Sequence, residues 1–295
     1  MKSRLQLLLA SVLVFALAPA LAQTATAASP DCGPTVKKPN GQAWKCTFVD
    51  EFTGSALNRN KWVVQRTAVS GHSANKADCW VDNPNNISVS GGTLKLTSRK
   101  ESSTFVCNHP LRTYRTQYSS GSISTWGKFQ QTFGRWQVRA KFPNIGQTGS
   151  HSAVWLYPKD QAYGSWPKSG EIDVVEYYSR HNDRVYPVLH YRARGTANGS
   201  MSTKKCLVAD PSSFHTYTAE WTTTKIRIWA DNTLCIDHTI RPSGRNMDAP
   251  APFDKPFVTY ITQALGVGQN RFRDIGRNKT PLPARTEVDW IRVWS

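Results

Sequence analysis

The sequence predicts an all-β protein, a β-sandwich or jelly roll, and three observations lead to that prediction. Apolar and polar residues alternate with a period of two over several short segments, among them 136–142, 225–230 and 288–294. Turn-forming residues separate these segments. No long segment shows the 3.6-residue apolar period of a helix. Strands with one apolar face must bury it against a second layer, which gives a sandwich.

Each expected strand is bounded by residues that end strands. The pair Gly91-Gly92 lies between two alternating segments and predicts a hairpin. We expect no internal repeat or linker after the lead-in of residues 28–39, so residues 28–295 are predicted to form a single domain. The strands and the turns beside them are 87–89 and 93–97 around Gly91-Gly92, 136–142 before Pro143-Asn144, 225–230 before Asp231-Asn232, and the closing segment 288–294.

The first 27 residues predict a secretory signal peptide. Lys2 and Arg4 precede a mostly apolar stretch over 7–17, and small-residue cleavage patterns end at Ala22 and Ala27. The apolar stretch is shorter than the roughly 20 residues that cross a bilayer. We therefore expect a secreted, extracellular protein without a membrane span, cleaved after Ala22 or Ala27.

The composition is strongly basic. The 295 residues carry 37 Lys and Arg against 20 Asp and Glu, a formal net charge of +17, and the signal peptide accounts for only two of the positive charges. Such an excess of positive charge is typical of a protein that binds nucleic acid, an anionic surface or an acidic substrate. A hydrophobic fraction of 39% with 11 tryptophans is too apolar for a disordered polycation. Export and the lack of a nucleic-acid-binding motif argue against nucleic acid as a partner.

All six cysteines lie beyond the signal peptide. An even number in an exported protein favours disulfides, and six cysteines allow about 15 pairings. The C-x-x-C spacing typical of zinc and redox sites does not occur. We expect cysteines that are neighbours along the chain to pair, which gives 32–46, 79–107 and 206–235.

The segment 169–177 holds three acids in a chain poor in acids. Glu171 and Asp173 face the same side of a regular strand, because side chains alternate. Glu176 lies at an odd offset and would face the opposite side. One extra residue in a β-bulge around 174–175 would return it to the same face. The sequence therefore predicts a bulged strand with three carboxyl groups on one face.

Three neighbouring carboxylates repel one another, so one of them should hold a proton near neutral pH. One protonated and one ionised carboxyl group are what cleavage of a glycosidic bond requires. The same spacing also fits an exposed polar face that binds nothing, or a calcium site, because carboxylate oxygens are the usual calcium ligands. Spacing alone leaves these alternatives open.

The motif 171–176, Glu-Ile-Asp-Val-Val-Glu, resembles the E-x-D-x-x-E active-site signature of glycoside hydrolase family 16, in the bulged form of its laminarinase-like endo-β-1,3(4)-glucanase branch. Further segments resemble family motifs in the same order, and the likeness covers roughly residues 48–294. They are 49–52 (the opening D-E-F), 134–141 (Y-G-R-x-E-x-R-x-K), 214–221 (F-H-x-Y-x-x-E-W) and 288–293 (V-D-Y-V-R-V).

The resemblance implies a concanavalin-like β-jelly-roll sandwich of two curved antiparallel sheets. It also implies endo-hydrolysis of a β-linked polysaccharide with retention of configuration, most directly of a β-1,3- or mixed β-1,3/1,4-glucan. By position, Glu171 is the implied nucleophile, Glu176 the acid/base, and Asp173 the residue that sets their protonation. No cofactor is expected for catalysis, and we expect a monomer whose partner is the polysaccharide.

Candidate substrate contacts come from aromatic residues and from the resemblance. Flat sugar faces pack on exposed aromatic rings, although a Trp in a β-sandwich is more often a core residue. Trp166 matches a position that lines the cleft in the family. His190 matches the position of a histidine that lies near the acid/base in the family. Arg135 contacts substrate or bridges strands, and Gln263 falls where relatives place a cleft-facing Asn. The full set is Trp126, Arg135, Trp155, Trp166, His190 and Gln263.

Three segments depart from the family pattern. His151-Ser152 replaces a usual Trp-Pro, and the segments 190–194 and 266–273 each gain two arginines, at 192, 194, 271 and 273. If these arginines face the cleft, their guanidinium groups suit carboxylate or sulfate groups. An anionic polysaccharide, sulfated or containing uronic acid, is therefore the alternative substrate. The other interpretation is that the arginines are solvated residues at the rim.

A structural calcium ion remote from the cleft is also implied by the resemblance. Asp289 matches its side-chain ligand, with Glu51 and Gly92 as backbone ligands. A third class of function is a non-catalytic glycan-binding jelly roll, but such proteins typically lose one or both glutamates of the motif, and both are present here.

Overall fold

The computed structural model describes residues 30–72, 77–194, 200–203, 206–243 and 247–295. The predicted signal peptide lies outside the described residues. Strands dominate, and the described helical elements are α1 (Thr67–Ser70) and a single 3₁₀ turn, η1 (Gly268–Asn270). Within the described part of the chain, no helix has the length and apolar character needed to cross a membrane.

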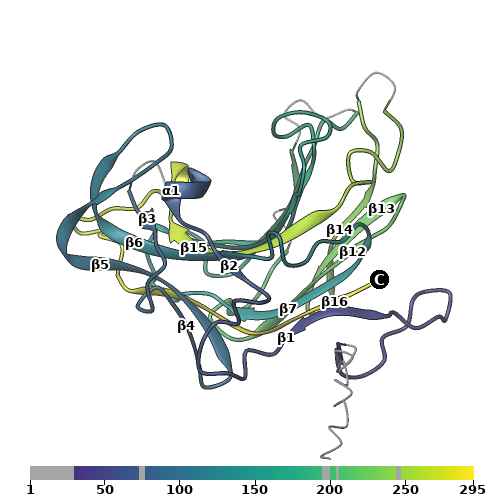
Figure 1. The fold of residues 1–295 in the computed structure, drawn as a ribbon, viewed down its shortest axis with the longest axis horizontal. Helices are drawn as coiled ribbons and strands as arrows, with labels where there is room; N and C mark the ends of the chain where they lie inside the picture. Colours follow the sequence, from purple (N-terminus) through teal and green to yellow (C-terminus); the bar gives the residue numbers. More distant parts are fainter. Residues whose placement is uncertain (1–29, 73–76, 195–199, 204–205, 244–246) are drawn as a thin grey trace, which may run out of the picture.

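The strands form two curved layers, one behind the other, and the outer face of one layer is concave and is called the trough below (Figure 1). One layer forms the floor of the trough, and the other packs against the back of that floor. In hydrogen-bonded order the floor layer is β11 (Ser200–Ser202), β10 (Tyr186–His190), β9 (Glu171–Tyr178), β8 (Ser150–Pro158), β15 (Phe257–Leu265) and β6 (Tyr114–Ser124), with β2 (Val63–Val64) also on β6. The back layer is β5 (Thr93–Cys107), β16 (Ala284–Trp294), β7 (Gly134–Lys141), β12 (His215–Trp221), β13 (Lys225–Ala230) and β14 (Thr233–Thr239), with β4 (Ile87–Ser90) on β5 and β1 (Cys46–Asp50) on β16.

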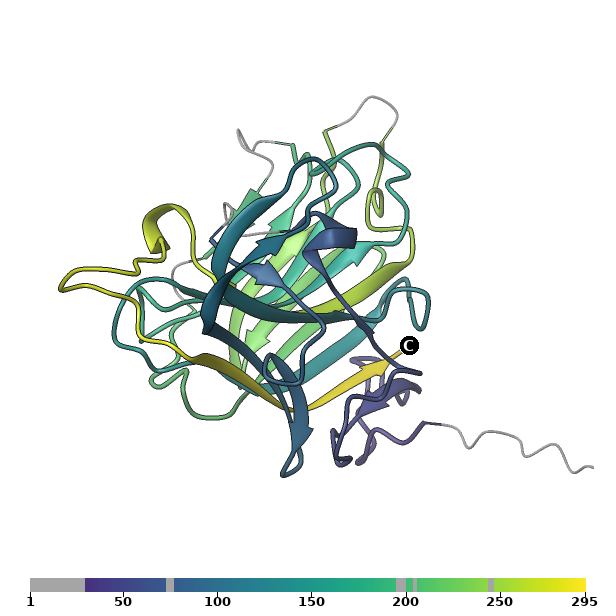
Figure 2. The same cartoon turned by 60° about the vertical axis from the view of Figure 1, so that its left-hand side comes forward.

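The long strand β5 joins the two layers. Its first part pairs with β16 in the back layer, and its second part pairs with β6 in the floor layer. All strand pairs are antiparallel except that of β3 (Cys79–Trp80) with β6. Seen from the side, the N-terminal lead-in lies beside the last strand, β16 (Figure 2). The predicted sandwich of two curved antiparallel sheets is therefore confirmed.

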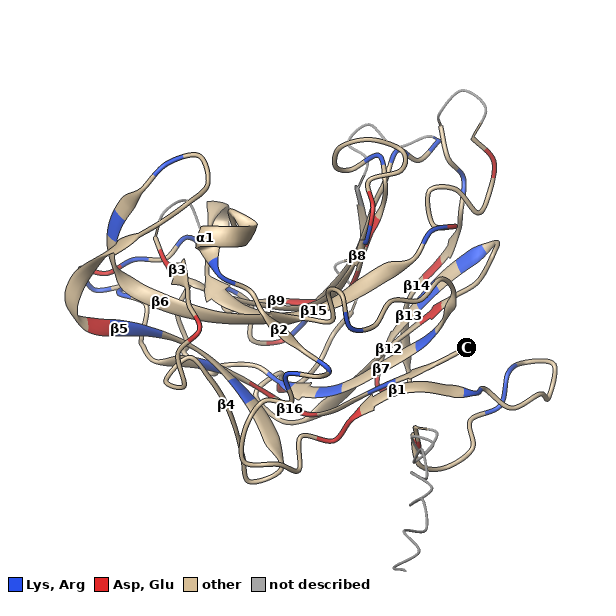
Figure 3. Cartoon of the chain, viewed as in Figure 1, with Lys and Arg blue, Asp and Glu red and all other residues tan. Residues whose placement is uncertain are grey.

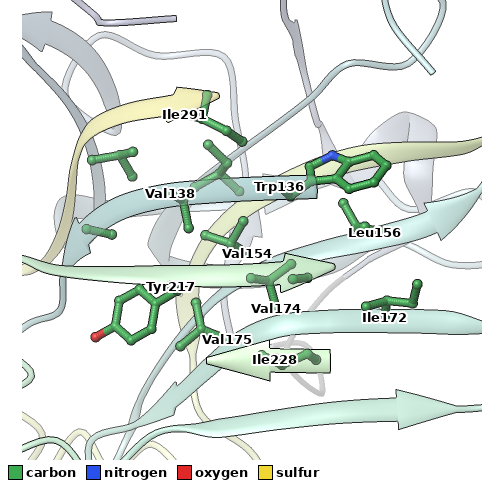
Figure 4. Packing of buried hydrophobic residues seen from close by; sticks show 14 of the residues in the cluster. Trp136, Val138, Val154, Leu156, Ile172, Val174, Val175, Tyr217, Ile228 and Ile291 are labelled. Carbon is green, nitrogen blue, oxygen red and sulfur yellow. The ribbon is translucent and has the colours of Figure 1, made fainter. Parts of the chain in front are cut away.

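The core lies between the layers because the strands alternate as the sequence predicts. On β7 every second residue is buried, and β13 has the same alternation. In the close view Trp136 and Val138 of β7 pack near Val154, Leu156 and Ile172 of the floor layer (Figure 4). The predicted hairpin joins β4 to β5 through Gly91-Gly92, both with positive φ, as a two-residue turn requires.

Truncation of a core leucine tests this arrangement. Leu96 on β5 is fully buried between the layers, so Leu96→Ala should lower the free energy of unfolding by about 2–5 kcal/mol. The matched control is Leu111→Ala, because the Leu111 side chain is 88% exposed and should change stability by less than about 0.5 kcal/mol. Urea unfolding followed by tryptophan fluorescence measures both. Equal losses would contradict the layered core.

The three disulfides join the cysteine pairs that the sequence predicts. Cys32–Cys46 ties the lead-in to β1, and Cys79–Cys107 ties β3 to the end of β5. Cys206–Cys235 ties the segment after β11 to β14. The expected pairing of cysteines that are neighbours along the chain is therefore confirmed.

The bulge predicted in β9 is present. Across the pair with β8, Ala153 lies opposite Glu176, and Trp155 lies opposite Asp173. Two steps on β8 therefore match three steps on β9, which leaves one extra residue in the 174–175 region. Both valines at 174–175 are buried in the core. The bulge turns all three acids toward the trough.

Candidate active site

The three acids of β9 line a cavity of about 500 Å³ on the floor layer. Neighbouring strands and three loops, which carry His72, Trp166 and Val267, complete its walls, which are largely aromatic. Besides Glu171, Asp173 and Glu176, the lining residues are His72, Trp80, His151, Ala153, Trp155, Tyr157, Trp166, His190, Thr262, Ala264, Leu265 and Val267. The sequence predicts the trio, and the strand register brings it together.

Glu176 is held by two donors on the same carboxylate oxygen. His151 Nε2 lies 2.9 Å from Glu176 Oε1, and the Tyr178 hydroxyl donates to the same atom at 2.8 Å. The His151 ring stacks on Tyr178 with centroids 4.8 Å apart, which fixes both donors. Burial raises the pKa of Glu176, but the hydrogen bonds and charge of its neighbours outweigh burial and hold the pKa below its usual value.

Asp173 lies between the two glutamates and is almost fully buried. His190 Nε2 lies 3.2 Å from Asp173 Oδ2. Burial, followed by the charge of Glu176, raises the pKa of Asp173 well above its ordinary value. A protonated Asp173 can donate a hydrogen bond to a neighbouring carboxylate, which suits a residue that sets the protonation of the pair.

Glu171 receives a hydrogen bond from the indole N–H of Trp166. Burial and the charge of Asp173 raise the pKa of Glu171 to about 8, although the charge of His190 and the Trp166 hydrogen bond oppose the rise. The free site therefore keeps protons on Glu171 and Asp173 over the neutral range, while Glu176 is ionised. Of the two glutamates, one is protonated and one is ionised, which agrees with the expectation that repulsion keeps a proton in the cluster.

Three of the six predicted substrate contacts line the cavity: Trp155, Trp166 and His190. Trp166 is 52% exposed and lies with its ring 5.3 Å from the His190 ring. Trp155 forms part of the floor, stacked on Tyr260 at 4.4 Å and bonded through Nε1 to Thr262 Oγ1. Two aromatic faces of different exposure are thus available to a sugar.

The other three predicted contacts do not line this cavity, although Arg135 bridges strands β7 and β12 through Glu220, which is one of the two alternatives for this residue. Gln263 is completely buried and bonds to Ser150 and Ser152, because β15 turns Thr262 to the cavity and therefore turns Gln263 into the core. Arg135 lies on β7 in the back layer, paired with Glu220 and lining a separate cavity. Trp126 is exposed on the loop after β6 and does not line the catalytic cavity.

Nine of the described residues that line the cavity, and Tyr178 beside it, are absent from the set predicted from sequence. His151 and Tyr178 hold Glu176, while His72 and Trp80 stack on each other with centroids 5.3 Å apart at the cavity wall. The replacement of Trp-Pro by His151-Ser152 is a sequence signal for His151. Tyr178 follows Glu176 by two positions and so shares its face.

The sequence matches the family model "Glycosyl hydrolases family 16" over residues 74–291. The chain belongs to this glycoside hydrolase family. A glucan endo-1,3-beta-glucosidase A1 of Niallia circulans is 31% identical over 83% of the chain, and a keratan-sulfate endo-1,4-beta-galactosidase of Sphingobacterium multivorum is 34% identical over 60%. The chain spans only 37% and 40% of the lengths of these two relatives.

Family 16 structures share the fold. The laminarinase from Rhodothermus marinus superposes with a TM-score of 0.67 and 27% identity, covering 85% of this chain and 97% of that structure. The predicted family and jelly-roll architecture are therefore confirmed. The family consists of retaining, endo-acting glycoside hydrolases that need no cofactor for catalysis.

The predicted side-chain ligand for calcium has a cationic neighbour. One carboxylate oxygen of Asp289, Oδ2, accepts a hydrogen bond from Arg139. Glu51 and Gly92 are predicted to contribute backbone oxygens, and the Glu51 side chain is paired with Arg292. The calcium site at Asp289, Glu51 and Gly92 stays a prediction.

Among the described residues, one group has metal-ligand geometry: Glu171, Asp173 and His190 offer ligand atoms within 4.8 Å of one another. Metal ligands must be deprotonated, whereas both of these carboxyl groups have raised pKa values. The group therefore suits proton chemistry better than metal binding.

Proposed function

We propose that this protein is a secreted endo-glycosidase that hydrolyses β-1,3- or mixed β-1,3/1,4-glucan with retention of configuration. The observation that carries the proposal is the bulged strand β9, which turns three carboxyl groups into one aromatic cavity. The three disulfides fit the oxidising compartments that an exported protein reaches.

The reaction has two steps in this site. Ionised Glu171 attacks the anomeric carbon while protonated Glu176 gives its proton to the leaving oxygen, which breaks the glycosidic bond and forms a glycosyl–Glu171 ester. Glu176 then takes a proton from water, whose oxygen attacks the same carbon and releases Glu171. Of the two glutamates only Glu171 holds a proton in the free site, so this proton must move to Glu176 before the first step. Asp173 lies between the glutamates on β9 and provides a route for it.

The lining of the catalytic cavity supports a neutral sugar at the cleaved bond. None of its described lining residues is Lys or Arg, and Trp155, Trp166 and Trp80 contribute aromatic surface. Aromatic rings bind the C–H faces of neutral sugars without requiring charge. The arginines at 192, 194, 271 and 273 are not among the lining residues, which weakens the anionic alternative for this cavity.

A substrate panel tests the proposal. Purified protein is incubated with laminarin, lichenan, agarose, carrageenan, keratan sulfate and a polyuronate, and new reducing ends are measured at low and raised salt. Hydrolysis of laminarin or lichenan with little effect of salt is the expected result. Activity confined to the charged polymers would overturn the proposal.

Trp166 should contribute to substrate binding as well as to Glu171. Trp166→Ala removes the exposed ring, and we expect KM for laminarin to rise about five- to ten-fold, from a loss of about 1 kcal/mol or more of packing on sugar. Trp166→Phe keeps a ring but loses the N–H that bonds to Glu171. The KM of Trp166→Phe should therefore lie close to that of the unsubstituted protein, whereas its kcat should still be lower. Steady-state kinetics of the two variants separate the roles, and an unchanged KM in Trp166→Ala would exclude a binding role.

A further inference from the structure

A second cavity of about 490 Å³ adjoins the catalytic cavity. Val267 lines both cavities. Tyr178, whose hydroxyl donates to Glu176 Oε1, also lines the second cavity. The two cavities therefore meet beside Glu176, so a polymer chain bound in one can place a neighbouring unit or branch in the other.

The wall of the second cavity combines aromatic rings with guanidinium groups. Tyr178 and Tyr186 pack edge to face with centroids 5.6 Å apart. Arg180 and Arg184 lie on the segment that connects the strands carrying these tyrosines, and both line the cavity. A sugar ring can pack on the phenol faces while a charged substituent reaches the guanidinium groups.

The charge balance of this wall is positive. Arg184 is paired with Asp183, whereas the Arg180 guanidinium is oriented by the uncharged side chain of Gln269, with Nη1 to Oε1 at 2.5 Å. The backbone N–H of Arg180 donates to Asn270 Oδ1, which fixes the start of the side chain. Arg180 is thus held in place by neutral groups and keeps its charge for a ligand.

The two adjoining cavities differ in their content of cationic residues. Lys and Arg are spread over strands and loops in all parts of the fold (Figure 3). The catalytic cavity has neither among its described lining residues, whereas the adjoining cavity has two arginines. Planar guanidinium groups bind carboxylate and sulfate groups in a bidentate manner.

We propose that the second cavity binds an anionic substituent, a carboxylate or sulfate group, on a sugar unit or branch next to the cleaved bond. A β-glucan that carries an acidic group on a unit next to the cleaved bond should then bind more tightly than the unsubstituted glucan, which is still hydrolysed. This inference rests on the proposed function, because it extends the site in which hydrolysis takes place.

Binding to an inactive variant tests the inference without turnover. In the Glu171→Gln background, the affinities for laminarin oligosaccharides and for the same oligosaccharides lightly carboxymethylated are measured by calorimetry at low salt. We expect the charged ligand to bind about ten-fold more tightly. Arg180→Gln should reduce that ratio to near one. The matched control, Arg112→Gln, makes the same change in net charge at an exposed residue that lines neither cavity, and should keep the ratio.

Each outcome has a separate meaning. Equal affinities for the two ligands, or an unchanged ratio in Arg180→Gln, would overturn the inference. Equal losses in Arg180→Gln and Arg112→Gln would also overturn it, since long-range attraction to a basic protein would then explain the preference. Hydrolysis of laminarin by the unmodified protein tests the proposed function independently, so the two proposals fail on different measurements.

Discussion

Glu171→Gln and Glu176→Gln should each lower kcat on an unactivated β-glucan by about 10³-fold or more while the fold persists. Glutamine keeps the shape of the side chain, but it cannot attack the anomeric carbon as an anion or transfer a proton. At neutral pH Glu171 holds a proton, because burial and the charge of Asp173 raise its pKa to about 8, so Glu171→Gln exchanges one neutral group for another. The melting temperature of Glu171→Gln should therefore not fall. Reducing-end release and thermal unfolding measure the two effects.

The two glutamates must also be told apart, because the free site holds its proton on the side of Glu171 whereas the first step needs it on Glu176. Glu171→Ala and Glu176→Ala are assayed with an activated aryl glycoside and azide. Without the nucleophile, azide attacks the anomeric carbon directly and gives the α-glycosyl azide. Without the acid/base, the glycosyl–Glu171 ester still forms and azide displaces it, giving the β-glycosyl azide. The opposite pattern of products would exchange the two roles, and substantial turnover of laminarin by either variant would refute both.

Local periodicity was enough to predict the catalytic strand. The odd spacing between Glu171 and Glu176 is incompatible with one face of a regular strand, so three useful acids require a bulge, and the register of β9 against β8 contains one. The strands β7 and β13 follow from the same alternation. These features depend only on neighbours along the chain, which the sequence states directly.

The positions of side chains relative to the cavity could not be predicted in the same way. Alternation divides a strand into two faces, but it does not say which face meets the trough. Gln263 lies on the core face of β15, and Arg135 on a strand of the back layer. The arginines that line a cavity beside Glu176 are 180 and 184, not those of the departing segments. Which loop ends reach the site depends on how distant strands pair.

The plot of kcat/KM against pH should be bell-shaped, with its acid limb and its alkaline limb unusually far apart in pH. The donors His151 and Tyr178 keep Glu176 ionised to below its ordinary pKa of 4.5, and burial with the charge of Asp173 keeps a proton on Glu171 up to a pKa of about 8. The state with one proton on the two glutamates therefore exists between these two values. Below the acid limb both glutamates are protonated, and above the alkaline limb both are ionised, so activity falls on either side.

His151→Phe should move the acid limb upward and leave the alkaline limb nearly in place. Phenylalanine can still stack on Tyr178, but it removes the donor 2.9 Å from Glu176 Oε1. Burial, which raises the pKa of Glu176, is then opposed by fewer groups, and the acid limb should move to higher pH. His151→Gln retains an N–H donor and should give an intermediate limb. If the acid limb does not move in a folded His151→Phe protein, His151 does not act on the pKa of Glu176 and serves only in packing. Loss of packing alone would lower the maximum of the pH profile without shifting its limbs.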